Sequence, residues 1–198
     1  MRTFRSLARL GALALLLLAA PRPVLAAQQV SGDWSVHERP GPPARLALRL
    51  DTDDADFSSD RYAPADLGLS LHELDAPGHH VTFTINRDAG RFACDGWVGG
   101  GSGAGTFTFT PNPGYLDALR QRGLAPPSDE RLFSAASLDL SLAYVDAMRA
   151  ALPAVDFHDL ITLRAMRIDT DYIRLAEAHG FHNLSAAELI RARALRIF

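Results

Sequence analysis

The chain has 198 residues, a formal charge of −3, 47% hydrophobic residues and one cysteine, Cys94. It contains no lysine, which a phosphate-binding P-loop requires. Its acidic balance excludes a strongly basic surface for nucleic acid, and a single cysteine excludes an intrachain disulfide.

Residues 1–26 have the pattern of a secretory signal. A leader with three arginines precedes the apolar run Leu10–Ala20, and a small-residue cleavage site ends at Ala26. Two prolines end this run, which is shorter than the about 20 apolar residues that cross a bilayer. We therefore expect an exported protein, periplasmic or extracellular, whose mature chain begins at Ala27. The alternative is an uncleaved N-terminal anchor.

Residues 27–111 alternate large apolar with polar side chains, which is typical of strands. The alternating segments are 33–37, 45–50, 67–74, 80–86, 91–98 and 106–110. The segments 80–86 and 91–98 predict a β-hairpin. Residues 51–66 are polar and lack a period, so we expect a surface loop there. The sequence thus predicts a small antiparallel β domain of five to six strands.

The glycine-rich stretch Gly96–Gly105 raises two catalytic or cofactor readings. A dinucleotide fingerprint requires a helix after the glycines, whereas residues 106–110 alternate like a strand. A serine-hydrolase elbow around Ser102 would need glycine in place of Ala104, and a helix after it. We therefore expect a hairpin turn. We expect its flanking strands to bury three aromatic residues, Trp97, Phe107 and Phe109.

Two segments resemble metal sites only in part. His72 begins a motif close to H-E-x-x-H, but Ala76 stands where the second histidine belongs, and a proline and a glycine follow. A site formed by His72, His79 and His80 is the alternative. The acidic run 51–56 has the composition of a calcium loop without its spacing. We expect neither a metal site nor a cofactor.

Cys94 alternates with Phe92, so we expect it to be a small buried residue. A hydrolase that uses Cys94 or Ser102 with His72 or His80 is one alternative function. Binding of a small apolar ligand within the β domain is another. We assign no catalytic residue.

Residues 112–198 change to a helical period and contain an internal repeat of 28 to 29 residues. Tyr115, Tyr144 and Tyr172 occupy one equivalent position, and Leu140, Ile168 and Ile197 another. Each unit predicts two short helices, which are marginal alone and must pack on their neighbours. We expect three α-hairpins in a short solenoid, with Ile161 and Ile190 buried between units.

The repeats also present a candidate partner-binding surface, because solenoids bind partners along extended faces. Its residues are Tyr144, Tyr172, Arg164, Arg167, Arg191, Arg193 and Arg196. The alternative is that the repeated tyrosines anchor the first helix of each unit. Both roles are compatible.

The segment 92–112 has the pattern F-x-C-x-G-W, a glycine-rich turn and G-x-F-x-F-x-P-N, and 159–168 and 188–197 follow the pattern D-L-I-x-L-R-x-x-x-I/V. From Trp34 onward the chain thus resembles a group of uncharacterised exported bacterial proteins. These repeats are also similar to the extracytoplasmic part of some membrane zinc peptidases of the antirepressor type. The chain lacks a peptidase motif, so the resemblance implies an accessory or sensory module and supplies no catalytic residues.

We therefore expect an α+β protein with a signal peptide (1–26), an antiparallel β domain (27–111) and three α-hairpin repeats (112–198). We expect a non-catalytic interaction or sensing module that binds a protein or peptide partner outside the cytoplasm through its repeats. Nucleic acid is not expected as a partner, and self-association through the end of the array stays open.

Overall fold

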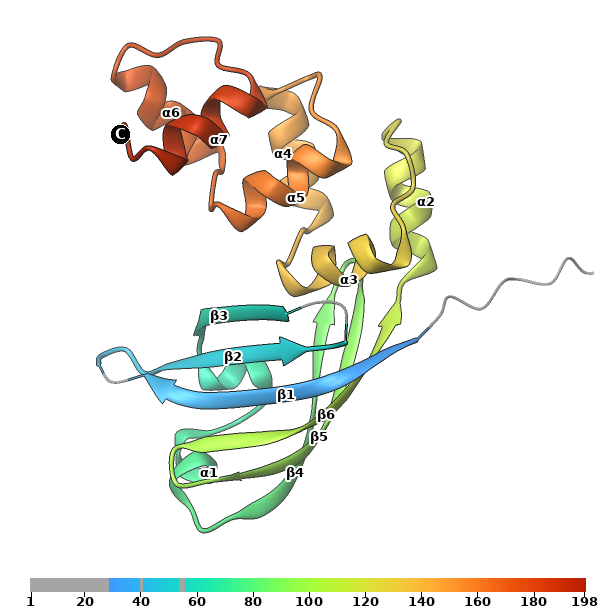
Figure 1. The fold of residues 1–198 in the computed structure, drawn as a ribbon, viewed down its shortest axis with the longest axis vertical. Helices are drawn as coiled ribbons and strands as arrows, with labels where there is room; N and C mark the ends of the chain where they lie inside the picture. The colour runs from blue at the N-terminus through green and yellow to red at the C-terminus, as the bar shows by residue number, and fades with distance from the viewer. Residues whose placement is uncertain (1–28, 40, 54–55) are drawn as a thin grey trace, which may run out of the picture.

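The computed structural model describes residues 29–198 apart from 40, 54 and 55, so the expected signal segment 1–26 lies outside the described residues. One antiparallel sheet precedes a helical region, an α+β fold (Figure 1). The strands are β1 (Val30–Arg39), β2 (Arg45–Asp51), β3 (Asp56–Tyr62), β4 (His79–Arg87), β5 (Gly90–Gly99) and β6 (Ser102–Pro111). The helices are η1 (Pro64–Leu67), α1 (Leu71–Asp75), α2 (Pro113–Gln121), α3 (Asp129–Ser137), α4 (Leu142–Ala151), α5 (Phe157–Ala165), α6 (Thr170–Ala178) and α7 (Ala186–Ala194).

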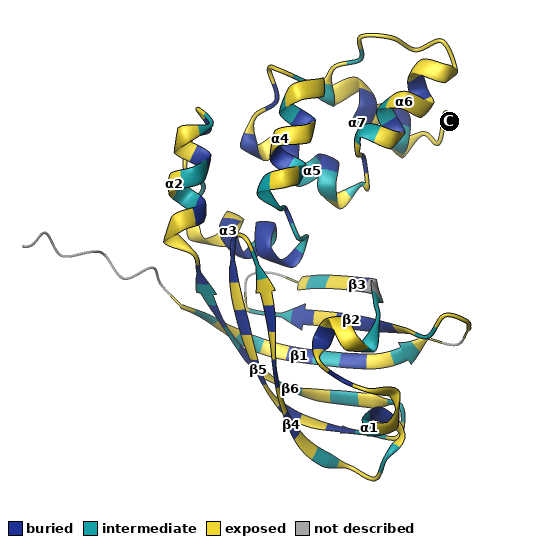
Figure 2. Cartoon of the chain, turned by 180° about the vertical axis from the view of Figure 1, so that it is seen from behind, coloured by how far each residue is buried: buried dark blue, intermediate teal, exposed yellow. Residues whose placement is uncertain are grey.

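The sheet has the strand order β3-β2-β1-β6-β5-β4, and every neighbouring pair is antiparallel. The expected hairpin is present as β4 and β5, in which Phe83 lies opposite Cys94. Buried and exposed residues alternate along β5 (Figure 2). The sheet therefore has one face directed into the core and one directed to solvent, which we call the inner face and the outer face.

The glycine-rich stretch is a hairpin turn, as the sequence predicts. Gly100 and Gly101 connect β5 to β6 with φ of 60° and 77°, a conformation that glycine adopts without steric cost. Gly96 lies across from Gly105 on the inner face, and a Cβ atom at Gly96 would lie 2.7 Å from the Trp34 ring. Glycine in these strands thus makes room for a buried tryptophan.

The expected burial of Trp97 is wrong. Its side chain is 61% exposed, whereas Phe107 and Phe109 are buried as expected. Trp97 comes an odd number of positions after buried Phe92 on the same strand, so the pleat directs the two side chains to opposite faces.

Two local predictions between the strands are also wrong. Residues 67–74 do not form a strand: they include the end of η1 and the start of α1. The Ser70 hydroxyl accepts a hydrogen bond from the Glu73 backbone N–H, and the Glu73 carboxylate accepts one from the Ser70 N–H, a capping box that starts the helix. Residues 51–66 are not only a loop, because they contain the polar edge strand β3.

In the described part of the chain, helices α2 to α7 form three consecutive α-hairpins (Figure 1). Each hairpin ends in the same way, with a residue at positive φ after its second helix: Asp139 (56°), Arg167 (58°) and Arg196 (53°). The N–H group of the next residue then donates a hydrogen bond back to a carbonyl of the helix. These bonds run from Leu140 to Ala135, from Ile168 to Leu163 and from Ile197 to Ala192. This is the Schellman arrangement of a helix C-terminus. The structural repeat therefore coincides with the repeat in the sequence.

The expected burial of Ile161 and Ile190 is only partly correct. Both pack against the core but remain half-buried, whereas the preceding residues, Leu160 and Leu189, are fully buried. Adjacent side chains on a helix point about 100° apart, so only one residue of each pair can point directly at the neighbouring unit.

One buried cluster runs from the inner face of the sheet into the array. Phe133 of α3 joins the two parts, with its ring 5.8 Å from that of Phe92 and 5.7 Å from that of Phe109. Aromatic pairs at such separations contribute beyond the area they bury. The first hairpin is thus packed directly on the sheet.

Candidate functional site

A polar pocket of about 400 Å³ lies between the sheet and the start of the helical array. Its lining comes from β3, η1, the end of β4, the end of α3, and α5. The lining residues are Phe57, Ser59, Tyr62, Asp66, Arg87, Ser137, Leu138, Asp139 and Arg164.

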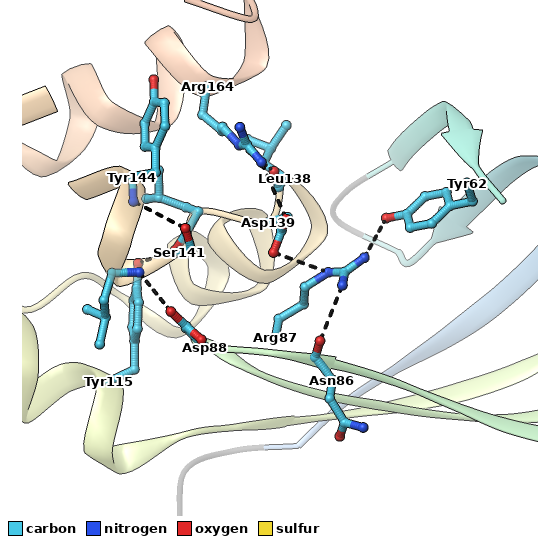
Figure 3. A network of polar contacts seen from close by, with 12 residues as sticks. Tyr62, Asn86, Arg87, Asp88, Tyr115, Leu138, Asp139, Ser141, Tyr144 and Arg164 are labelled. Atoms are coloured by element: carbon cyan, nitrogen blue, oxygen red, sulfur yellow. Dashed lines mark hydrogen bonds and ion pairs between the residues drawn. The ribbon is translucent and has the colours of Figure 1, made fainter. Parts of the chain in front are cut away.

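The turn after β4 fixes the sheet against the array and so positions Arg87. The Asp88 carboxylate accepts a hydrogen bond from the N–H of Leu142, 2.8 Å away at the start of α4 (Figure 3). The side-chain amide of Asn112, at the start of α2, donates to the Asp88 carbonyl at 2.9 Å. Arg87 precedes this turn and therefore projects into the junction.

Two guanidinium groups converge on one carboxylate in this pocket (Figure 3). Arg87 Nε lies 3.5 Å from Asp139 Oδ1, and Arg164 Nη2 lies 3.4 Å from Asp139 Oδ2. Each arginine has a further fixed contact: Arg87 donates to the Tyr62 hydroxyl at 3.3 Å, and Arg164 donates to the Leu138 carbonyl at 3.0 Å. Both ion pairs are long compared with charge-assisted hydrogen bonds, which are about 2.7–2.9 Å.

Among the described residues, two buried polar atoms of the pocket make no hydrogen bond: Ser137 Oγ, and Arg87 Nε, whose one contact is the long ion pair with Asp139. Ser137 is only 3% exposed. A buried polar atom without a partner costs about 1–3 kcal/mol, so native structures rarely leave one without a role. Asp66 also lines the pocket, but its carboxylate accepts a hydrogen bond from the Ala63 N–H at 2.7 Å. The arrangement can accept one further anionic oxygen.

Four of the seven predicted partner-binding residues make contacts between or within the repeats. The Arg164 guanidinium lies 5.0 Å from the ring centroid of Tyr144, and that of Arg193 lies 4.9 Å from the ring centroid of Tyr172. Arg193 Nε also donates to the carbonyl of Met166 in the preceding unit. These tyrosines and arginines therefore act as structural anchors.

The other three predicted residues, Arg167, Arg191 and Arg196, are exposed. Of the seven, Arg164 alone lines the pocket. Sequence reasoning missed Arg87, Ser137 and Asp139. A charged residue beside a turn and a serine at a helix end are too common to signal a site.

The arrangement that a hydrolase would require is not present among the described residues. Cys94 is buried on the inner face, and this burial raises the pKa of its thiol to about 12, so it stays protonated. The Ser102 hydroxyl donates to the Gly99 carbonyl, and His80 contacts Asp95 on the outer face. Within the described part of the chain, no hydrogen bond joins a histidine to Cys94 or Ser102.

The inner face also leaves little space for an apolar ligand. The rings of Phe92 and Phe107 lie 5.8 Å apart and both contact Phe133. The Trp34 ring packs edge-on against Phe83. The protein's own side chains thus fill this part of the sheet.

Within residues 29–39, 41–53 and 56–198, no three histidine, cysteine or carboxylate side chains are grouped as metal ligands. Asp51 and Asp56 of the acidic run both pair with Arg49. Over the same described residues, no helix has the length and hydropathy needed to span a bilayer.

No family model matches the chain, and no curated protein or solved structure matches it either.

Proposed function

We propose that this protein is a non-catalytic binding module that acts outside the cytoplasm and holds the carboxylate of a peptide or protein partner in the pocket at the sheet–array junction. The observation that carries the proposal is the convergence of Arg87 and Arg164 beside the buried Ser137 hydroxyl, which makes no hydrogen bond to any described residue. This observation supports a partner position at the start of the array rather than along the repeated tyrosines.

The charges in the pocket favour an anion. Arg87 and Arg164 are both partly buried, with side chains 19% and 26% exposed, and they share Asp139, which is more exposed. Arginine presents several donors in a fixed plane that matches a carboxylate. A ligand carboxylate would bring Ser137 Oγ the acceptor that it lacks, and would offer Arg87 Nε a shorter contact than its 3.5 Å ion pair with Asp139.

The remaining lining favours a ligand that also has an apolar part. Phe57 and Leu138 line the same pocket as the arginines. A C-terminal residue of a peptide combines a carboxylate with a side chain, and such recognition is a recurrent mode of peptide binding. The leader of residues 1–26 supports a partner outside the cytoplasm.

Ser137→Ala is the sharpest test, because the Ser137 hydroxyl makes no hydrogen bond in the described part of the chain and its loss should leave the fold intact. Binding would be measured by isothermal titration with N-acetylated tripeptides that end in leucine or phenylalanine, and with their C-terminal amides. The proposal expects binding of the free carboxylates alone. It expects at least about tenfold weaker binding for Ser137→Ala and for Arg87→Gln.

Arg174→Gln serves as the matched control, since Arg174 is exposed on α6 and pairs with Asp171. This variant should bind like the parent. Equal affinity for a peptide and its amide would contradict the proposal. So would the absence of binding by every free carboxylate.

A further inference from the structure

The outer face of the sheet carries one large exposed aromatic side chain in a row of polar and small residues. Across the strands from β4 to β2, this row is His80, Trp97, Ala104, Ser35 and Arg49. The next row is Thr82, Asp95, Thr106, Asp33 and Asp51. Trp97 is thus the only large apolar side chain in these two rows of the described structure.

Trp97 is held in place from one side only. Its ring contacts the His80 imidazole edge-on, with centroids 5.7 Å apart and an interplanar angle of 77°. The imidazole is in turn fixed by Asp95, which lies 3.1 Å from His80 Nε2. On the other side lies Ala104, which is too small to cover an indole. The Trp97 side chain is therefore oriented and yet 61% exposed.

A shallow hollow of about 450 Å³ adjoins this tryptophan, since Ala104 lies beside Trp97 and lines the hollow. The rest of its lining is Asp33, Trp34, Ser35, Arg49, Asp51, Gly105 and Thr106. The Arg49 guanidinium is held by Asp51 at 3.2 Å and by Asp56 at 2.9 Å. Asp33 forms no such ion pair with any residue that the structure describes, so its exposed carboxylate can accept hydrogen bonds from a ligand.

These groups match a ligand that has one apolar face and a rim of hydroxyls. The indole offers a flat surface on which the C–H groups of a sugar ring can pack. Carboxylates accept hydrogen bonds from hydroxyls, and serine and threonine hydroxyls both donate and accept. We propose that the outer face binds a neutral sugar ring of a glycan, with Trp97 as the stacking surface and Asp33 as the main polar contact.

Other occupants fit this face less well. A stable protein interface has a core of several apolar residues, whereas Trp97 stands alone among polar neighbours. A membrane surface attracts basic residues, whereas the two rows around Trp97 hold three carboxylates, those of Asp33, Asp51 and Asp95, and one arginine, Arg49. The same carboxylates disfavour an acidic sugar. This site lies on the outer face and does not depend on the junction pocket.

The test is titration of the chain lacking residues 1–26 with three oligosaccharides: β-1,4-linked glucose, β-1,4-linked N-acetylglucosamine and α-1,4-linked glucose. Isothermal titration measures binding to the parent and to each variant alike, since Trp97→Ala removes one fluorophore and the other tryptophan, Trp34, lies in the lining of the hollow. We expect at least one sugar to bind. We expect Trp97→Ala and Asp33→Asn each to weaken its binding at least about tenfold.

Two control variants separate this site from others. Thr84→Ala changes the same face two rows away from Trp97, and Arg87→Gln changes the junction pocket. Both should bind the sugar like the parent. Binding that survives Trp97→Ala would overturn the proposal, as would the absence of any response up to about 10 mM of all three sugars. Quenching of Trp97 by an arginine-rich peptide instead would assign the face to a cationic segment.

Discussion

Tyr144 donates its hydroxyl to the backbone carbonyl of Ile168, at the end of the same hairpin, with an O···O distance of 2.6 Å. Tyr115 makes the equivalent bond in the first hairpin, to the carbonyl of Leu140 at 2.9 Å. In the third hairpin the Tyr172 hydroxyl is buried without a partner. Among the described residues, the tyrosine hydroxyl therefore makes a hydrogen bond in the first two hairpins and none in the third.

This difference predicts unequal effects of removing the hydroxyl. Tyr144→Phe and Tyr115→Phe should each lower the free energy of unfolding by about 1–3 kcal/mol, because a buried carbonyl loses its donor. Tyr172→Phe removes a hydroxyl that has no partner and should be neutral or slightly stabilising. Urea melts of the three variants measure this. Equal losses at all three positions would contradict the assignment.

Leu160 and Ile161 provide a second comparison, at adjacent positions of α5. Leu160 is fully buried, so Leu160→Ala should cost about 2–5 kcal/mol through lost burial and a residual cavity. Ile161 is half-buried, so Ile161→Ala should cost clearly less. Denaturant unfolding followed by circular dichroism at 222 nm compares them. A larger loss for Ile161 would show that the helix is rotated relative to this structure.

Much of the fold follows from local patterns in the sequence. The turn at Gly100–Gly101, the β4–β5 hairpin and the repeat led by tyrosines were all predicted, because each depends on residues close together in the chain. Trp97 was assigned to the core because of its residue type. Counting positions from Phe92 would have placed it on the outer face, since alternate residues of a strand face opposite sides.

The pocket could not be predicted in the same way. Tyr62, Arg87, Asp139 and Arg164 come from four separate segments of the chain. They meet only because Phe133 packs α3 on the sheet and Asp88 holds the start of α4. These packing contacts depend on the relative placement of two parts of the fold, for which a single sequence carries no periodic signal.

The close packing around the strand glycines predicts that alanine lowers the free energy of unfolding more at these glycines than at a turn glycine. A Cβ at Gly96 would lie 2.7 Å from Trp34 and would also collide with the Ala104 carbonyl, and one at Gly105 would lie 2.5 Å from the Gly96 Cα. Gly96→Ala and Gly105→Ala should therefore each cost about 3 kcal/mol or more, the upper range for overpacking.

Gly101→Ala is the matched control for these variants. No atom lies within 4 Å of a Cβ at Gly101, so only its positive φ opposes a side chain. That strain should cost about 1–2 kcal/mol. Near-ultraviolet circular dichroism of the Trp34 band, together with urea melts, compares the variants. If Gly101→Ala were the most destabilised of the three variants, the prediction would be wrong.

The buried thiol of Cys94 should make the free energy of unfolding fall as the pH rises in the alkaline range. Burial raises the pKa of its thiol to about 12 in the folded protein, whereas an exposed thiol has a pKa of about 8.5. The folded state thus holds the proton more tightly. Its stabilising contribution is complete below about pH 8.5 and is lost as the pH rises toward the folded-state pKa.

The expected result is that the parent protein loses about 2 kcal/mol more than Cys94→Ala between pH 8 and pH 10. Burial also raises the pKa values of Tyr115 and Tyr144, but these residues are common to both proteins and cancel in the comparison. Urea melts at the two pH values measure the difference. Parallel losses in the two proteins would mean that the thiol ionises in the folded state, and hence that water reaches the inner face of the sheet beside Phe92.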